Sequence, residues 1–391
     1  MPARNLRSLE HDPRGYGAAG DAHADSDFLL GDLLFHSPHT LGPRARALGL
    51  SCHTCHPNGA AHGELVIPGL SDRPGNVDMS TAVLRPAADD RVANAVNVPS
   101  LRGCRYTAPY FRDGRAASLE ALVQQVVTGE LDGEPLAQRE LAALVGYVLQ
   151  LDFLPNRNLD ARNRLSAHAS AAAQRGERVF TTPRPAFAGQ SCASCHPASS
   201  FFRDGRVHRV GSGAPPSPHA LDGGYETPTL LGTAETAPYF HDGRFANLGE
   251  VVAWFDRELG LQLSAQDQAD LVAYLEAIGA VDRPADDRPL ASRLDQTFAY
   301  ASLLSAARPR RIWLAALDQI GALLPGAPGP VAARAAALRA ELSALGEQVR
   351  SGAPLPVLAR KAAPLRGQLA RLAADWAGAA SAVAERTDAA R

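Results

Sequence analysis

Apolar residues recur at helical spacing in two separate parts of the chain. In each part a glycine precedes a phenylalanine by four residues, and further on a leucine precedes a tyrosine by three, which places each pair on one helix face. The pairs are Gly31 with Phe35, Gly176 with Phe180, Leu144 with Tyr147, and Leu271 with Tyr274. No apolar–polar alternation runs far enough to indicate a sheet. The pattern predicts a mainly α-helical protein.

The two parts are copies of one another. The segment "NVPSLRGCRYTAPYFRDGRAASLEALV" (Asn97–Val123) resembles "ETPTLLGTAETAPYFHDGRFANLGEVV" (Glu226–Val252) at a constant offset, with TAPYF and DGR in both. A linker near 156–163 separates the copies. We therefore predict two tandem domains, residues 27–156 (the first repeat) and 157–283 (the second repeat).

The composition changes after Asp282. Helix-forming Ala, Leu and Arg dominate there, and "PGAPGP" and "SGAPLP" interrupt them. Helix formers cut by Pro and Gly predict about three helices in residues 284–391, most simply a structural cap or docking surface. Residues 1–26 are polar and predict a mobile tail.

Composition and charge exclude several classes of protein. The 391 residues carry a net charge of −2, which draws the chain to no nucleic acid. No apolar run reaches the roughly 18 residues that a membrane span needs. The first residues contain no apolar segment of the secretory type.

The chemistry lies in two CxxCH motifs, "SCHTCHPNGAAH" from Ser51 and "SCASCHPASS" from Ser191. Two thiols on one turn can bond to a porphyrin edge, and the next residue, a histidine, can ligate the iron. A four-cysteine zinc site would need closer pairs, and a redox dithiol predicts an αβ pattern that is absent. The sequence predicts two covalent c-type haems, on Cys52, Cys55 and His56 and on Cys192, Cys195 and His196. The fifth cysteine, Cys104, is expected to be a buried apolar residue.

With "FRDGRAASLE" and "TAPYFHDGR", these motifs resemble the bacterial di-haem cytochrome c peroxidases, a superfamily that includes the enzymes maturing methylamine dehydrogenase. The resemblance covers residues 27–281. It implies two cytochrome c-like domains in the periplasm, one haem that transfers electrons and one that reacts with hydrogen peroxide, and a small redox protein as electron donor. It leaves the C-terminal helical extension and the oligomeric state open.

The resemblance also implies a calcium ion between the domains. Its ligands match Asn97 and the carbonyl groups of Thr236 and Pro238, and oxygen ligands suit Ca²⁺. Arginines of the DGR motifs usually pair with haem propionates, which a guanidinium fork fits. The residues expected around the haems are Arg115, His241, Arg244 and Trp254. Tyr110, Tyr239 and Trp254 are aromatic residues near the motifs; electron-hopping relays use such residues, but packing is the expected role.

The chain departs from the family at the residues that usually fill the distal coordination position of each haem iron. Phe255 stands where the second haem usually finds a Met or Tyr ligand, and Asp72 where the first finds a distal histidine. We therefore lean towards an open second haem, although family precedent favours the first. Four residues elsewhere in the loops are candidates for distal ligation instead: Met79, His62, His208 and His219.

The peroxide-binding residues depart as well. Arg112 replaces the tryptophan between the haems, and Leu122 replaces a glutamine. The acid that assists O–O cleavage has three weak candidates, Glu130, Asp132 and Glu134. The sequence thus predicts unequal haems and a peroxidase-like oxidoreductase. The alternatives are a non-enzymatic electron carrier and an oxidase of a protein or small organic partner.

Overall fold

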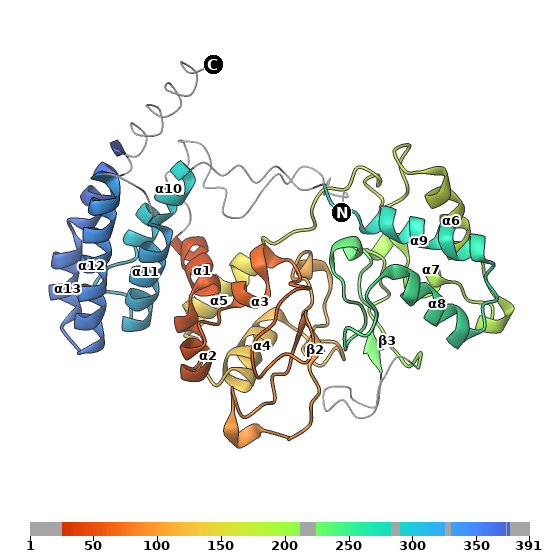
Figure 1. Ribbon diagram of the computed structural model, residues 1–391, viewed down its shortest axis with the longest axis horizontal. Helices are drawn as coiled ribbons and strands as arrows, with labels where there is room; N and C mark the ends of the chain where they lie inside the picture. The colour runs from red at the N-terminus through yellow and green to blue at the C-terminus, as the bar shows by residue number, and fades with distance from the viewer. Residues whose placement is uncertain (1–25, 212–223, 283–289, 325–329, 373, 376–391) are drawn as a thin grey trace, which may run out of the picture. The chain divides into compact units, whose positions relative to one another are not determined.

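The computed structural model describes residues 26–211, 224–282, 290–324, 330–372 and 374–375 (Figure 1). Within these residues the chain is mainly helical, as predicted. The predicted mobile tail lies outside the described residues, except for Ser26, which begins the first helix. None of the described helices combines the length and apolar character needed to cross a bilayer.

The helices and strands have the following bounds. The α-helices are α1 (Ser26–His36), α2 (Pro43–Ala47), α3 (Cys52–Cys55), α4 (Leu119–Gln124), α5 (Gln138–Val148), α6 (Ala171–Thr181), α7 (Cys192–Cys195), α8 (Leu248–Leu259), α9 (Ala265–Gly279), α10 (Leu290–Ala301), α11 (Arg310–Leu323), α12 (Pro330–Arg350) and α13 (Leu355–Ala362). A π-helical stretch, Gln125–Glu130, continues α4. The strands are β1 (Asn76–Val77), β2 (Val96–Asn97), β3 (Val207–His208) and β4 (Tyr225–Glu226).

Two compact units divide the described residues. One contains residues 53–135 and 148–282, and the other contains residues 26–52, 136–147 and 290–375. We call them the loop unit and the helical unit. This division groups α1 and α5 with the C-terminal helices, so the domain boundaries at 156 and 283 remain predictions.

In the loop unit, α6 and α9 cross at Gly176. A Cβ atom on this glycine would lie only 1.9 Å from the carbonyl oxygen of Asp270 and 2.7 Å from the Cβ of Tyr274. The ring centroids of Phe180 and Tyr274 are 5.0 Å apart. Together with Leu271, these two aromatic residues are buried in one apolar core. The spacing predicted for these residues therefore produces a helix crossing that only glycine allows.

The helical unit contains the matching crossing of α1 and α5 at Gly31. A Cβ atom there would lie 2.1 Å from the carbonyl oxygen of Ala143 and 2.7 Å from the Cβ of Tyr147. The rings of Phe35 and Tyr147 pack 5.1 Å apart, and both side chains are fully buried. In both copies, the spacing of glycine, phenylalanine and tyrosine thus reflects the same close crossing of two helices.

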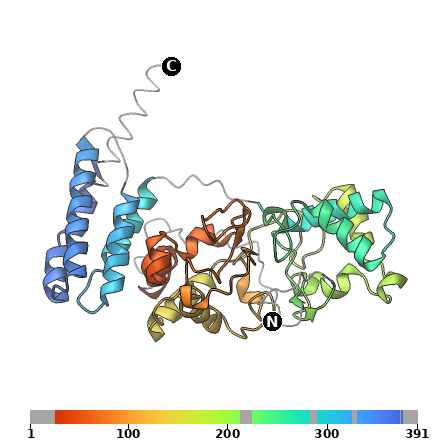
Figure 2. The same ribbon diagram turned by 60° about the horizontal axis from the view of Figure 1, so that its bottom comes forward.

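The C-terminal extension of the helical unit contains four labelled helices among the described residues, rather than about three. The two interruptions predict one helix before "PGAPGP", but this segment is divided, because α10 ends at Ala301 and Pro309 caps the start of α11. Figures 1 and 2 show α10, α11, α12 and α13 side by side with their axes roughly aligned. Trp313 on α11 and Leu365, which follows α13, are both fully buried.

A buried carboxylate fastens this extension to α1. Asp32 has no exposed surface. The hydroxyl of Tyr300 donates to its carboxylate at 2.6 Å, Gln296 donates at 3.0 Å, and Nδ1 of His36 lies 3.1 Å away. Burial alone would raise the pKa of Asp32, but these polar partners, His36 first, hold it below its usual value. The carboxylate is therefore charged at neutral pH.

Short two-stranded ladders, which the sequence pattern did not predict, fix the loops of both repeats. In the loop unit β1 pairs antiparallel with β2, bringing Asn76 opposite Asn97, and β3 pairs with β4. The repeated APYF turns share one backbone conformation, since Phe111 (φ 64°) and Phe240 (φ 70°) both adopt the left-handed region. The repeat is therefore structural as well as sequential.

Candidate functional site

The first cysteine pair occupies a single helical turn, α3, and His56 follows directly. Cys52 and Cys55 are free thiols. Nδ1 of His56 lies 2.9 Å from the carbonyl oxygen of Pro99. A carbonyl oxygen only accepts, so Nδ1 carries the proton. Burial lowers the pKa of His56 to about 4, which leaves a neutral ring with a lone pair on Nε2.

The second pair repeats this geometry on α7. Ser191 and Ser194 cap the turn reciprocally. Nδ1 of His196 lies 2.8 Å from the carbonyl oxygen of Phe202, and burial lowers the pKa of this histidine as well. Burial raises the pKa of the Cys192 thiol to about 11, so that thiol stays protonated.

Each turn therefore presents two thiols and one neutral imidazole whose outer nitrogen is anchored to a backbone carbonyl. This donor set fits c-type haem, because the thiols can form the thioether bonds and Nε2 can ligate the iron. The carbonyl anchor fixes the tautomer and the ring orientation, as it does for metal-bound histidines in general. The remaining cysteine, Cys104, is buried as predicted, and burial raises its pKa to about 12.

Two histidines predicted as distal ligands are held by the protein. Nδ1 of His62 lies 2.9 Å from the carbonyl oxygen of Thr54, inside the first attachment turn. Nε2 of His208 lies 2.7 Å from Oδ2 of Asp204, and both side chains have ligand atoms within 4.8 Å of the Cys195 sulfur. The His62 contact leaves Nε2 available, whereas Nε2 of His208 is engaged by Asp204, and ligation by either histidine stays a prediction.

The other positions considered for distal ligation differ in exposure. Met79 is partly buried in the turn that follows β1, next to the buried carboxylate of Asp78. Asp72 is exposed and lies 3.5 Å from Arg73. His219 lies outside the described residues. Met79 therefore remains a predicted ligand, and the carboxylate of Asp72 faces solvent.

Phe255 belongs to an aromatic cluster in the second repeat. Its ring centroid lies 4.9 Å from that of Trp254 and 5.8 Å from that of Phe240. Phe245 contacts both Phe240 and Trp254. The position where a ligand would be expected is therefore occupied by packed hydrocarbon, and Trp254 has a packing role.

The three acids of the first repeat have different surroundings. Glu130, at the end of the π-helical stretch, is partly buried, and Arg115 donates to it at 3.4 Å. Burial raises the pKa of Glu130, although the positive charge of Arg115 opposes this. Asp132 and Glu134 are exposed. Arg115 also binds Asp113 at 3.0 Å, so only Glu130 combines shielding with a cationic partner.

The second DGR motif is arranged similarly. Arg244 binds both oxygens of Asp242 at 2.8 Å. His241 is buried and stacks on Tyr225 with ring centroids 4.4 Å apart. Burial lowers the pKa of His241 to about 4. In both repeats, the arginine expected to meet a propionate is oriented by the aspartate of its own motif.

The predicted calcium ligands come together in part. The side-chain amide of Asn97 contacts the carbonyl oxygen of Pro238. Its neighbour across the ladder, Asn76, donates to the carbonyl of Asp242 at 2.8 Å, and Oδ1 of Asn76 is buried without a hydrogen-bond partner among the described residues. Thr236 lies two residues before Pro238 on the same turn. The carbonyl oxygens of Pro238 and Asp242 thus lie beside the side chains of Asn97 and Asn76, and calcium binding there stays a prediction.

Arg112, the residue in the tryptophan position, also joins the two repeats. Its guanidinium donates to the carbonyl of Asn97, and its own carbonyl accepts from the amide of Glu226 at 2.8 Å. Burial lowers the pKa of Arg112 to about 10. Near the partly buried Leu122, Oε1 of Gln124 is buried and lacks a hydrogen-bond partner among the described residues. A side-chain amide is therefore present two positions after the missing glutamine.

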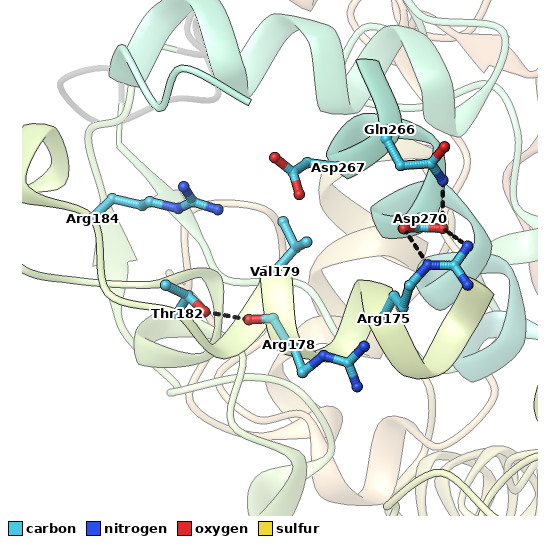
Figure 3. Close-up of a pocket in the computed structure, with 8 residues that line it drawn as sticks. All are labelled: Arg175, Arg178, Val179, Thr182, Arg184, Gln266, Asp267 and Asp270. Atoms are coloured by element: carbon cyan, nitrogen blue, oxygen red, sulfur yellow. Dashed lines mark hydrogen bonds and ion pairs between the residues drawn. The ribbon is translucent and has the colours of Figure 1, made fainter. Parts of the chain in front are cut away.

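The described residues of the loop unit line cavities near both repeats. One, of about 850 Å³, is lined by residues of both repeats, among them His62, Glu64, Arg73 and Arg244. The other, of about 370 Å³, lies against α6 and α9. In Figure 3, Arg175 turns to Asp270, which it binds at 2.8 and 2.6 Å. The second cavity therefore adjoins an ion pair that fastens the two helices next to the Gly176 crossing.

Sequence reasoning missed a buried arginine between the repeats. Arg203 is 6% exposed. It donates to the carbonyls of Tyr106 and Ala108 at 3.2 and 3.0 Å and pairs with Glu226. A charged residue directly after the aromatic pair in "SSFFRDGR" was the available signal. The carbonyls that it binds lie far away in the sequence and could not be read from it.

Paired thiols, each set followed by an anchored neutral imidazole, in a mainly helical frame, define the class of c-type cytochromes. Residues 170–321 match the family model described as "Di-haem cytochrome c peroxidase". This match assigns residues 170–321 to the di-haem cytochrome c peroxidase/MauG family, whose members bind two c-type haems.

Several characterised relatives are similar to parts of the chain. The methylamine utilization protein MauG of Methylorubrum extorquens is 25% identical over 301 residues, which is 64% of this chain and 77% of that protein. Hydrazine synthase subunit gamma of Kuenenia stuttgartiensis is 24% identical over 255 residues, 51% of this chain and 69% of that protein. The cytochrome-c peroxidase IdrP1 of a Pseudomonas species is 37% identical over 78 residues, 17% of this chain and 21% of that protein.

Two solved structures are also similar. The hydrazine synthase of Kuenenia stuttgartiensis aligns with a TM-score of 0.47 at 21% identity, covering 68% of this chain and 92% of that chain. A MauG-like protein associated with microbial copper homeostasis aligns with a TM-score of 0.48 at 19% identity, with the same coverage.

Proposed function

We propose that the chain is a di-haem oxidoreductase of the peroxidase type, with haem c attached at Cys52 and Cys55 and at Cys192 and Cys195. One observation carries this proposal. Both motif histidines are neutral, and both direct Nδ1 at a backbone carbonyl, so Nε2 is available for iron. Membership of the family supports the same reading.

When bound, the haems supply an iron that can react with peroxide and a second redox centre that passes electrons. The chain supplies orientation and proton handling. His56 and His196, oriented by their carbonyl anchors, would hold the two haem irons through Nε2. Burial raises the pKa of Glu130, and a raised pKa is the direction that general acid assistance requires.

We assign the open coordination position to the second haem. The packed ring of Phe255 offers no donor atom, and His208 is engaged by Asp204. The position of Glu130 in the first repeat favours the first haem instead. The effect of a Glu130→Gln substitution on the peroxide reaction separates the two assignments, since this change affects only chemistry at the first haem.

The electron donor is proposed to be a small redox protein, and the location the periplasm, where c-type haem is attached in this family. Two alternative functions would behave differently in these experiments. An electron carrier would have both irons closed, with Met79 as one ligand. An oxidase of a protein or small organic partner would react with peroxide but not turn over a small cytochrome, and Arg112 in the tryptophan position favours such a changed electron route.

The test begins with haem content. A pyridine spectrum and a haem-stained denaturing gel should show two covalent haems per chain. Cys52→Ala/Cys55→Ala and Cys192→Ala/Cys195→Ala variants should each retain one. A chain that binds one haem or none contradicts the proposal at its first step.

The second step is the reaction with peroxide. The calcium-loaded protein is mixed with hydrogen peroxide, fully oxidised and half-reduced, and the Soret band and the oxidation of a reduced small cytochrome are followed. We expect a rapid spectral change and turnover. If peroxide does not react at either redox level, the hypothesis of a peroxidase-type enzyme is wrong, and the hypothesis of an electron carrier is the one that is left.

A further inference from the structure

Three aromatic rings from distant parts of the chain form a stack inside the loop unit. The ring of Tyr106 lies over that of Phe201 with centroids 4.5 Å apart and an interplanar angle of 20°. Phe153 completes the stack, 6.1 Å from Tyr106 and 5.9 Å from Phe201, at 13° and 25°. Near-parallel rings at these distances are in direct π contact.

The stack joins the loops that hold the two motif histidines. Phe201 directly precedes Phe202, whose carbonyl oxygen accepts from His196. Tyr106 lies on the loop that begins at Asn97 and contains Pro99, whose carbonyl oxygen accepts from His56. The stack thus connects the loop that supports one motif histidine with the loop that supports the other.

The position of Tyr106 is fixed from the second repeat. Arg203 donates to the carbonyl of Tyr106 at 3.2 Å. At the other side, a Cβ atom on Gly103 would meet the ring of Phe153 at 2.1 Å. The backbone of this loop at Gly103 therefore packs directly against Phe153 of the stack.

The hydroxyl group of Tyr106 has a partner that can take a proton. It donates to Oδ2 of the buried Asp152 at 3.3 Å. The tyrosines repeated in the two APYF turns differ, because Tyr110 donates to the carbonyl of Cys104 at 3.2 Å and Tyr239 to that of Thr233 at 2.8 Å. A backbone carbonyl accepts a hydrogen bond but no proton at neutral pH, whereas a carboxylate accepts both.

We propose that Tyr106 is a one-electron relay between the two haem sites, with Asp152 as its proton acceptor. The phenol ring of Tyr106 would give one electron to the haem site that peroxide has oxidised, and the phenol proton would move to the Asp152 carboxylate. The products are a neutral tyrosyl radical and a neutral carboxyl group. An electron arriving from the partner haem, together with the returning proton, restores the phenol and the carboxylate.

This inference rests on the proposed function, since the oxidant is a haem oxidised by peroxide. It also accounts for Arg112, because the stack provides an aromatic route at a different place from the missing tryptophan. Arg203 is a positioning residue for this relay, as it holds the tyrosine backbone without touching the ring.

Electron paramagnetic resonance of the holoprotein tests the relay. Protein containing ring-deuterated tyrosine is compared with unlabelled protein after rapid freezing with peroxide. We expect a tyrosyl radical whose hyperfine splitting changes with the label. The signal should be lost in Tyr106→Phe, which keeps the stack, and in Asp152→Asn, whose amide oxygen still accepts from the Phe153 amide. It should persist in Tyr110→Phe, the matched control.

The failure of the proposed function is distinguishable from the failure of the relay. If the Soret band responds to peroxide but no tyrosyl radical forms, or if the radical survives in Tyr106→Phe, the relay is wrong and the enzyme reading stands. If peroxide leaves the Soret band unchanged, the proposed function fails. The same variants are then oxidised with photogenerated ruthenium(III) tris-bipyridine, and equal radical yields in Tyr106→Phe, Asp152→Asn and the parent protein reject the relay.

Discussion

Replacing Gly31 by alanine tests the helix crossing that precedes the first attachment turn. The new Cβ atom would lie 2.1 Å from the carbonyl oxygen of Ala143, whereas ordinary contact begins at 3.4 Å. In a close-packed interior α1 and α5 must therefore separate by about 1 Å. Overpacking of this kind costs ~1–3 kcal/mol, and a backbone atom that cannot turn aside places the cost at the upper end.

Helix propensity opposes this loss, because alanine is favoured over glycine by about 1 kcal/mol inside a helix. The net destabilisation should be about 2 kcal/mol. For a unit of this size that corresponds to a fall in melting temperature of roughly 8 °C. The measurement is a thermal melt of the holoprotein followed by far-ultraviolet circular dichroism, with haem content checked first.

Gly146 on α5 supplies the matched control. Among the described residues, no atom lies within 4 Å of a Cβ atom at this position. Gly146→Ala should therefore raise the melting temperature, by roughly 4 °C, through propensity alone. A Gly31→Ala protein that melts at or above the wild-type temperature would refute the argument that close approach of the two helices requires this glycine.

Three further predictions concern the other contacts. Tyr300→Phe removes a hydrogen bond to the buried Asp32 carboxylate and should cost ~1.5–3 kcal/mol in urea unfolding, so an unchanged midpoint would contradict that contact. The pKa of Asp32 is lowered in the folded state. The stability that Asp32 contributes is therefore present above its ordinary pKa of about 4 and is lost as the pH falls through the lower folded value. An acid titration followed by circular dichroism should show this loss in wild-type protein and not in Asp32→Asn. Asn97→Ala should abolish any effect of calcium chelation on the haem spectra, and a chelator response that survives this change would place the ion elsewhere.

The sequence predicted the helical architecture where the signal was local. A glycine four residues before a phenylalanine marks each crossing helix, and Gly31 and Gly176 are both in contact with a partner backbone in the structure. The count of C-terminal helices was less accurate, because the break between Ala301 and Arg310 contains only one proline. The two-residue strands have no alternation to detect. The family assignment, which rested on motif spacing, is confirmed.

The candidate site was predictable only where its chemistry lies within a few residues. The attachment turns could be read directly, whereas the carbonyl that orients His56 lies 43 residues away. Distal ligation, calcium and the acid remain predictions. The aromatic stack had one usable signal, since Tyr106 aligns with Glu235 in the second repeat. This position is aromatic in one copy and charged in the other, which indicates a role that only one repeat has.

The contact between Asp32 and Tyr300 also sets an order of events during synthesis. The two residues are 268 positions apart. At the usual elongation rate of 5–20 residues per second, α1 waits roughly 13–54 s before its partner on α10 is made. The entropy cost of closing a loop grows only slowly with its length. The long separation therefore affects when the contact forms more than how stable it is. Until α10 is made, the carboxylate on α1 stays uncovered by it, and a chain cut short before α10 never completes this contact.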